Sequence, residues 1–184
     1  MCSFLSAALA ALTALGAAEG LVPNRAPVRI EREGHVLLTA TDRRVRALAA
    51  DVEMILARGM ARSTTFGRLM TDIDNTDVIV YVEFSSKLRQ TVAGRLLFAG
   101  TTREGTRYLR VQLSPDMTIS QHVAVLAHEL QHALEVARAP EVRDQTSFAR
   151  LYDRIGSGKN EELYYETKAA REIGRRVLIE VQQP

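Results

Sequence analysis

Cysteine, tryptophan and the other aromatic residues are scarce in this chain. Its 184 residues include one cysteine, Cys2, no tryptophan, five tyrosines and five phenylalanines. A single cysteine excludes an intramolecular disulfide, so the fold must depend on a hydrophobic core, which a chain of this length can bury without covalent cross-links. The small number of aromatic side chains disfavours a stacking platform for single-stranded nucleic acid.

Charge of one sign is not in excess either. The 24 basic and 22 acidic residues leave a formal net charge of +2, which does not predict a nucleic-acid partner, and the arginines are scattered along the sequence. The sequence also lacks internal repeats and low-complexity linkers. We therefore expect one globular domain, spanning residues 19–184, and the oligomeric state stays open.

Residues 1–18 carry no charged side chain, unlike the remainder of the chain. They are rich in alanine and leucine, and they end in small residues at the two positions that a signal peptidase reads, Gly16 and Ala18. This pattern predicts a signal peptide and a mature chain that begins near Glu19, in a secreted or periplasmic protein. Cleavage would remove Cys2, so the mature domain would have no thiolate ligand and no thiol nucleophile.

Other locations stay open because the basic residue that usually precedes the apolar run of a signal peptide is missing. The alternatives are an uncleaved membrane anchor and a wrongly assigned start, the latter leaving a cytoplasmic protein. The run is short and rich in alanine, so it predicts a poor membrane-spanning helix. No stable membrane span is expected after cleavage.

Apolar alternation predicts strands at residues 78–84, 92–99 and 108–113. In the first of these strands, the residues that point to either face, Val78, Val80 and Val82 on one and Ile79 and Tyr81 on the other, are apolar or aromatic. This pattern is typical of a central strand covered on both faces. Residues 100–105 contain the glycines of a hairpin connection between the other two. A leading strand or hairpin is expected within residues 21–38.

Apolar residues at three- and four-residue intervals predict helices. The first is expected to begin at a Thr41 cap and to stop at Gly59, and the second to follow Ser63. Three more are expected, over residues 120–138 with Thr118 or Ser120 as the cap, over residues 145–155 and from residue 160 to about 181. Together these elements predict an α+β domain with a small mixed or antiparallel sheet packed against helices.

Two of the four histidines, His128 and His132, stand four residues apart in a predicted helix. Residues at this spacing project from one side of a helix, so both imidazoles can direct a nitrogen at one zinc ion, whose ligand nitrogens lie at about 2.0 to 2.1 Å. Glu129 lies beside the first histidine, where it can act as the general base for a metal-activated water. In the alternative interpretation, these are exposed helix side chains that carry no ion.

A catalytic zinc site usually has three protein ligands, so a third is required. The motif with a third histidine would need glycine at Glu135 and histidine at Arg138, and it is therefore excluded. A carboxylate or a distant histidine remains. The glutamates of the last predicted helix are Glu161, Glu162, Glu166 and Glu172. We favour Glu166, which is expected in mid-helix before two small residues, Ala169 and Ala170, and Glu162 is the second choice.

At these residues the chain resembles the gluzincin group of zincin metallopeptidases, in which an H-E-x-x-H helix is completed by a glutamate on a later helix. The resemblance rests on residues 128–132 and residues 166–170. It implies a zincin-like fold, a zinc ion and a protein or peptide substrate. It also implies that the strand before the motif helix, residues 108–113, borders the cleft and can pair with an extended peptide.

Several neighbours of the motif are candidates for supporting roles. Glu135 can hydrogen-bond a ligand imidazole, although a surface position is the alternative. Hydrolysis also benefits from a donor for the developing oxyanion. The candidates for this role, by proximity in sequence, are Tyr152, Tyr164, Tyr165 and Arg171. We expect His35 and His122 not to be ligands.

The sequence thus predicts a zinc metallopeptidase that hydrolyses peptide bonds. Two other classes stay open. One is a secreted or envelope binding protein that keeps the fold without catalysis. The other is a cytosolic metal-dependent regulator, which requires that residues 1–18 are not removed.

Overall fold

The computed structural model describes residues 31–32, 35–36, 43–157 and 165–183. The predicted signal peptide, Glu161, Glu162 and Tyr164 lie outside the described residues. The chain divides into two units, residues 1–37 and residues 38–184. In the first unit, β1 (Glu31–Arg32) and β2 (His35–Val36) pair antiparallel, which confirms the expected hairpin.

The second unit contains a mixed four-stranded sheet in the order β3-β4-β6-β5. Its strands are β3 (Val45–Ala47), β4 (Val78–Phe84), β5 (Gly94–Thr101) and β6 (Arg107–Leu113). Strand β4 pairs parallel with β3 and with β6, whereas β5 pairs antiparallel with β6. The α+β class and the mixed sheet are confirmed.

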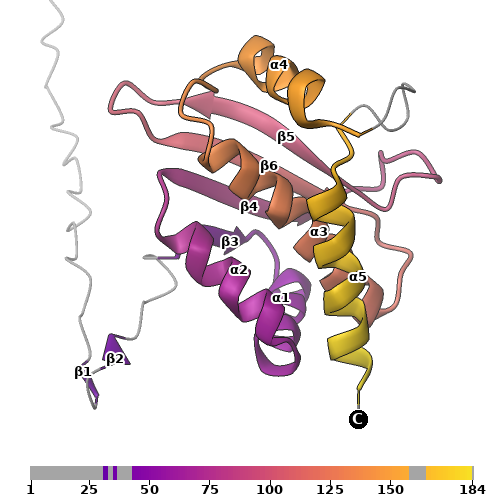
Figure 1. The fold of residues 1–184 in the computed structure, drawn as a ribbon. Coiled ribbons are helices and arrows are strands. Elements are labelled where there is room, and N and C mark those ends of the chain that lie inside the picture. Colours follow the sequence, from indigo (N-terminus) through magenta and orange to yellow (C-terminus); the bar gives the residue numbers. More distant parts are fainter. Residues whose placement is uncertain (1–30, 33–34, 37–42, 158–164, 184) are drawn as a thin grey trace, which may run out of the picture. The chain divides into compact units, whose positions relative to one another are not determined.

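The described residues of this unit form five helices: α1 (Ala50–Arg62), α2 (Thr64–Asp74), α3 (Ile119–Ala137), α4 (Gln145–Ile155) and α5 (Lys168–Gln182). Helices α1, α2, α3 and α5 lie over one face of the sheet, and α4 lies beside β5 (Figure 1). The core lies between the sheet and these helices. Its fully buried apolar side chains include Val52, Phe66, Ile73, Val80, Leu109, Leu126, Leu130 and Val177. Within the described ranges, no helix has the length and hydropathy that a membrane span requires.

The first predicted helix is wrong at both ends. Residues 45–47 form β3, because the Arg44 carbonyl accepts a hydrogen bond from Val80 of β4, a long-range pairing that local periodicity does not reveal. Helix α1 then continues through Gly59 to Arg62. The ring of Phe66 explains this glycine, since a Cβ atom at position 59 would lie 2.8 Å from ring carbons.

The expectation that β4 is covered on both faces is also wrong. Val80 and Val82 are fully buried on the helix side, but Tyr81 on the other face is only partly buried and stacks on Tyr108 of β6, with ring centroids 6.2 Å apart. Strand β4 is therefore central within the sheet, and the described helices cover one of its faces.

Helix α5 begins at Lys168, later than predicted, because Thr167 is its N-cap and its hydroxyl accepts a hydrogen bond from the Ala170 N–H. The predicted mid-helix position of Glu166 is wrong. Glu166 lies one residue before the cap, in the segment that leads into α5.

Candidate metal centre

Helix α3 presents the two histidines of the motif. Thr118 is its N-cap and forms a capping box with Gln121, which selects Thr118 between the two predicted caps. One turn apart in the middle of this helix, His128 and His132 bring their Nε2 atoms to 3.2 Å, with the rings at 79° to each other. The two imidazoles therefore converge on one point.

Glu166 reaches the same point from outside the helix. Its Oε1 atom lies 3.7 Å from the His128 Nε2 atom. This buried oxygen has no hydrogen-bond partner among the described residues, although buried carboxylate oxygens are nearly always paired. Candidate ligand atoms of His128, His132 and Glu166 all lie within 4.8 Å of one another. The group can hold a metal ion.

The backbone around Glu166 is held in place on both sides. Its carbonyl accepts hydrogen bonds from the N–H and the hydroxyl of Ser157, at 2.7 and 3.0 Å. The next residue, Thr167, caps α5 and donates its hydroxyl to the Glu135 Oε1 atom at 2.7 Å. These bonds fix the segment that aims the Glu166 carboxylate at α3.

Helix α5 packs antiparallel against α3. Thr167 at its start contacts Glu135 near the end of α3, whereas Gly174 lies against Ala124 and His128, earlier in α3. A Cβ atom at position 174 would be 3.2 Å from the Ala124 carbonyl oxygen and from the His128 Cβ atom. The expected close approach of the last helix to the motif helix is present, and Gly174 is a small residue that allows it.

The His132 ring is oriented by Glu135, and the alternative of a plain surface position for Glu135 is wrong. Its Nδ1 atom lies 2.9 Å from the Glu135 Oε2 atom. When Nδ1–H donates to this carboxylate, the Nε2 lone pair is left to face Glu166 and His128. Sequence analysis missed Thr167, the second partner of Glu135. Its preference for a helix N-cap is the signal that could have identified it.

Burial controls the charge of the two motif residues whose pKa values shift. Burial and, to a smaller extent, the neighbouring His132 together lower the pKa of His128 to about 4, against the opposing effect of Glu135. The imidazole is therefore neutral at neutral pH, the form that binds metal. Burial raises the pKa of the Glu129 carboxyl to about 7; His132 opposes this shift and the Glu166 carboxylate adds to it.

Strand β5 forms the wall beside Glu129. A Cβ atom on Gly94 would lie 2.6 Å from the Val125 Cγ1 atom and 3.1 Å from the Glu129 Oε1 atom, so only glycine fits here without a shift. A backbone hydrogen bond from Leu96 also acts on the Glu129 carboxyl and lowers its pKa. Neither contribution of β5 was predicted from the sequence.

The strand expected at the cleft, residues 108–113, is not the one that borders it. These residues belong to β6, which pairs with β4 on one side and with β5 on the other. Strand β5 is the edge of the sheet, and its residues Gly94 and Leu96 line a cavity of about 210 Å³ together with the motif residues. Local alternation identifies a strand but does not give its place in the sheet.

Aromatic side chains form the opposite wall of this cavity. Tyr152 of α4 is 2% exposed and donates its hydroxyl to the His132 carbonyl at 3.2 Å, and burial raises the pKa of this hydroxyl. The Tyr152 hydroxyl proton is used in this hydrogen bond, so it is not available to a developing oxyanion. Arg171 donates to the Ser157 hydroxyl at 3.2 Å and is not among the residues lining the cavity. Tyr165 lines the cavity and is 41% exposed.

His122 lies apart from this centre, as expected. It is 6% exposed, its Nε2 atom lies 2.9 Å from the Ser114 carbonyl oxygen, and its ring contacts the Phe84 ring edge-on. These contacts are structural. His35 lies in β2, in the other unit of the chain.

Comparisons of the chain with models of known protein families, with curated proteins and with solved structures found no match.

Proposed function

We propose that the protein is a zinc-dependent metallopeptidase with a zincin-like fold of the gluzincin type. The observation that carries this proposal is the convergence of His128, His132 and Glu166 on one point beside Glu129, where the Glu166 Oε1 atom has no hydrogen-bond partner among the described residues. Two imidazoles and one carboxylate are a usual ligand set of catalytic zinc, which keeps a further position open.

Two of the distances between the donor atoms are compatible with zinc. Ligand atoms about 2.0 to 2.2 Å from a tetrahedral ion lie roughly 3.3 to 3.6 Å apart. The separations of 3.2 Å between the two histidine nitrogens and of 3.7 Å between His128 and Glu166 are close to this range. When bound, zinc supplies Lewis-acid polarisation of the scissile carbonyl and makes a nearby water more acidic.

The chain's own residues carry the proton transfers. Glu129 accepts a proton from the attacking water and then delivers it to the leaving amine. The Leu96 N–H acts on the Glu129 carboxyl, and Gly94 leaves room for it against β5. Among the described candidate donors, Tyr165 both lines the cavity and has an exposed side chain. We therefore assign to Tyr165 the stabilisation of the developing oxyanion.

The outer edge of β5, which pairs with no other described strand, provides a place for an extended peptide. The Ala93 carbonyl accepts a hydrogen bond from the Ser114 N–H, and Arg95 and Leu97 lie opposite Gln112 and Arg110 of β6. Backbone groups alternate along a strand, so those of Gly94 and Leu96 point away from β6. A substrate strand added here would place a peptide bond beside the motif.

Replacement of Glu129 by glutamine tests the mechanism. Glu129→Gln should keep zinc and lower the hydrolysis of fluorescein-labelled casein by about 10²- to 10⁴-fold, because the general base is lost. The control is Glu172→Gln on α5, an exposed carboxylate 3.7 Å from Arg176, which should retain activity.

Full activity of a zinc-loaded Glu129→Gln protein would refute the mechanism. Zinc binding by the wild type without any hydrolysis would favour the alternative, a binding protein without catalytic activity.

We further propose that the enzyme acts outside the cytoplasm after removal of residues 1–18. N-terminal sequencing of the native protein tests this. A mature chain that begins near Glu19 is expected, and an intact Met1 would favour the cytosolic regulator.

A further inference from the structure

Gln131 lies between the two motif histidines in the sequence of α3, but it lines a different cavity. It is 7% exposed, and its side-chain amide forms no hydrogen bond with another described residue. Buried side-chain amides nearly always have a partner, and an amide buried without one destabilises a protein. The Gln131 amide therefore points to a polar ligand in the cavity that it lines.

This cavity, of about 180 Å³, lies where α2, α3 and α5 meet, and we call it the three-helix cavity. The α3 helix contributes Gln131, Leu134 and, at its C-cap, Arg138 to the lining. Residues three and four apart share one helix face, so this face of α3 is turned towards the cavity. The volume far exceeds the roughly 10 to 15 Å³ that one water needs, which leaves room for a polyatomic ion.

The lining of the three-helix cavity has an excess of positive charge. Arg68 of α2 and Arg138 form no hydrogen bond or ion pair with another described residue. Arg176 of α5 also lines the cavity, but it lies 3.7 Å from Glu172 and is therefore not counted. Asp72 is the acidic lining residue. Two arginines against this one carboxylate leave a net positive charge, and the planar guanidinium group suits the oxygens of a phosphate.

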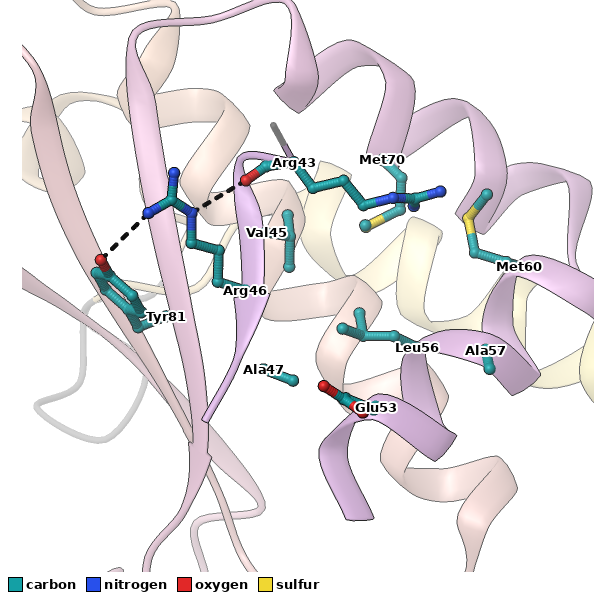
Figure 2. Close-up of a pocket in the computed structure, with 10 residues that line it drawn as sticks. All are labelled: Arg43, Val45, Arg46, Ala47, Glu53, Leu56, Ala57, Met60, Met70 and Tyr81. Atoms are coloured by element: carbon teal, nitrogen blue, oxygen red, sulfur yellow. Dashed lines mark hydrogen bonds between the residues drawn. The ribbon is translucent and has the colours of Figure 1, made fainter. Parts of the chain in front are cut away.

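The larger groove beside β3, of about 720 Å³, differs in its charges (Figure 2). Arg46 is already held there, since its Nε atom donates to the Arg43 carbonyl at 3.1 Å and its Nη1 atom lies 3.5 Å from the Tyr81 hydroxyl. Arg43 and Glu53, the other charged lining residues, balance each other. The three-helix cavity is smaller, but it combines a net positive charge with a buried amide that no described residue pairs.

We propose that the three-helix cavity binds a phosphate group. The Gln131 amide donates to one oxygen, and Arg68 and Arg138 donate to the others. The Asp72 carboxylate accepts a hydrogen bond from a protonated phosphate oxygen and repels sulfate, which has no proton to donate at neutral pH. The cavity shares no lining residue with the candidate metal centre, so the proposal does not depend on the peptidase activity.

Equilibrium dialysis against radiolabelled inorganic phosphate, at constant ionic strength, tests the site. The wild type should bind about one phosphate per chain. Arg68→Gln and Arg138→Gln should each weaken binding about tenfold or more, because each removes a charge-assisted hydrogen bond. The control is Arg175→Gln, an exposed arginine of α5 outside the lining, which should change the affinity less than about twofold.

Unlabelled competitors identify the ligand. Sulfate should displace the label about tenfold less well than inorganic phosphate, because of Asp72. Glycerol 3-phosphate that competes as well as inorganic phosphate would identify a phosphate ester as the ligand, and weaker competition would identify the free ion. Both of these results support a phosphate site.

Two further variants separate this site from helix packing and from the metal centre. Gln131→Met keeps a similar size and should weaken phosphate binding about tenfold without lowering the free energy of unfolding in phosphate-free urea titrations, because no hydrogen bond to a described residue is lost. Glu166→Ala should bind phosphate as the wild type does. No binding by the wild type, equal binding by Arg68→Gln and Arg175→Gln, sulfate as effective as phosphate, a destabilised Gln131→Met protein, or loss of binding in Glu166→Ala would overturn the proposal.

Discussion

Glu135 connects a candidate metal ligand to the segment that supplies another. One of its oxygens lies 2.9 Å from the His132 Nδ1 atom and the other accepts the Thr167 hydroxyl at 2.7 Å. Thr167 directly follows Glu166 in the chain. A single carboxylate therefore orients one imidazole on α3 and anchors the start of α5, so its removal disturbs both sides of the site.

Glu135→Ala should weaken zinc binding about 10- to 100-fold, as the loss of partners of metal-bound histidines usually does. Competition with a chromogenic zinc chelator measures this. Glu141→Ala is the matched control, because Glu141 is exposed and pairs with Arg154 away from the site. Identical zinc affinity of the two variants would show that Glu135 does not orient the ligand.

Gly94 lies close to Glu129, the proposed general base. Gly94→Ala should lower peptidase activity at least tenfold, because the added methyl group would force Val125 or Glu129 to move. Gly67→Ala in α2 is the control; no atom lies within 4 Å of its added Cβ, and alanine stabilises a helix interior by about 0.5 to 1 kcal/mol over glycine. Wild-type activity of Gly94→Ala would contradict the close approach of β5 to Glu129.

At the scale of elements, Arg107 of β6 holds the end of the motif helix. Its side chain is 1% exposed, and its Nη1 atom donates to the carbonyls of Val136 and Ala139 at 2.7 and 2.8 Å. Its Nε and Nη2 atoms donate to the two carboxylate oxygens of Asp77. The last turn of α3 is thereby attached to the sheet, which fixes the direction of the helix that presents the histidines.

Arg107→Met should destabilise the protein by about 3 to 5 kcal/mol, because it leaves buried carbonyls without donors and Asp77 without its partner. Arg154→Met removes an exposed ion pair with Glu141 and should cost about 0 to 1 kcal/mol. Urea unfolding compares the two. Equal stability of the variants would mean that Arg107 does not anchor α3.

Asp77 makes part of this anchoring dependent on pH. Burial opposes its ionisation, but the hydrogen bond and the charge of Arg107 outweigh burial and hold the Asp77 pKa below its ordinary value of 3.8. Its contribution to stability is therefore complete above pH 3.8 and is lost as the pH falls through the lower folded-state value. Asp77→Asn should flatten the acid side of the unfolding profile, and an unchanged slope would contradict this role.

Elements with local signals were predictable from the sequence. The alternation of residues 78–84 identified β4, and the four-residue spacing of His128 and His132 placed both on one helix face. Strand β3 was missed because its pairing with β4 joins residues about 35 positions apart. The edge position of β5 depends on tertiary packing in the same way. The position of Glu166 before a cap, in contrast, follows from the N-cap preference of Thr167, a local signal.

At the scale of the whole molecule, the two edges of one sheet have different environments. The β5 edge lies beside buried titratable groups in a small cavity, whereas the β3 edge lies beside apolar side chains in a larger open groove. Helix α3 packs on the sheet between these edges, and α5 packs on α3 (Figure 1). We propose that the chemistry takes place at the β5 edge.

The metal content of the purified protein tests the central claim most directly. After growth with zinc and desalting, elemental analysis should find about one zinc ion per chain in the wild type and in Glu172→Ala, and only a small fraction of that in Glu166→Ala, because the third ligand is lost. A wild type without zinc, or a Glu166→Ala protein that retains one ion per chain, would contradict the account.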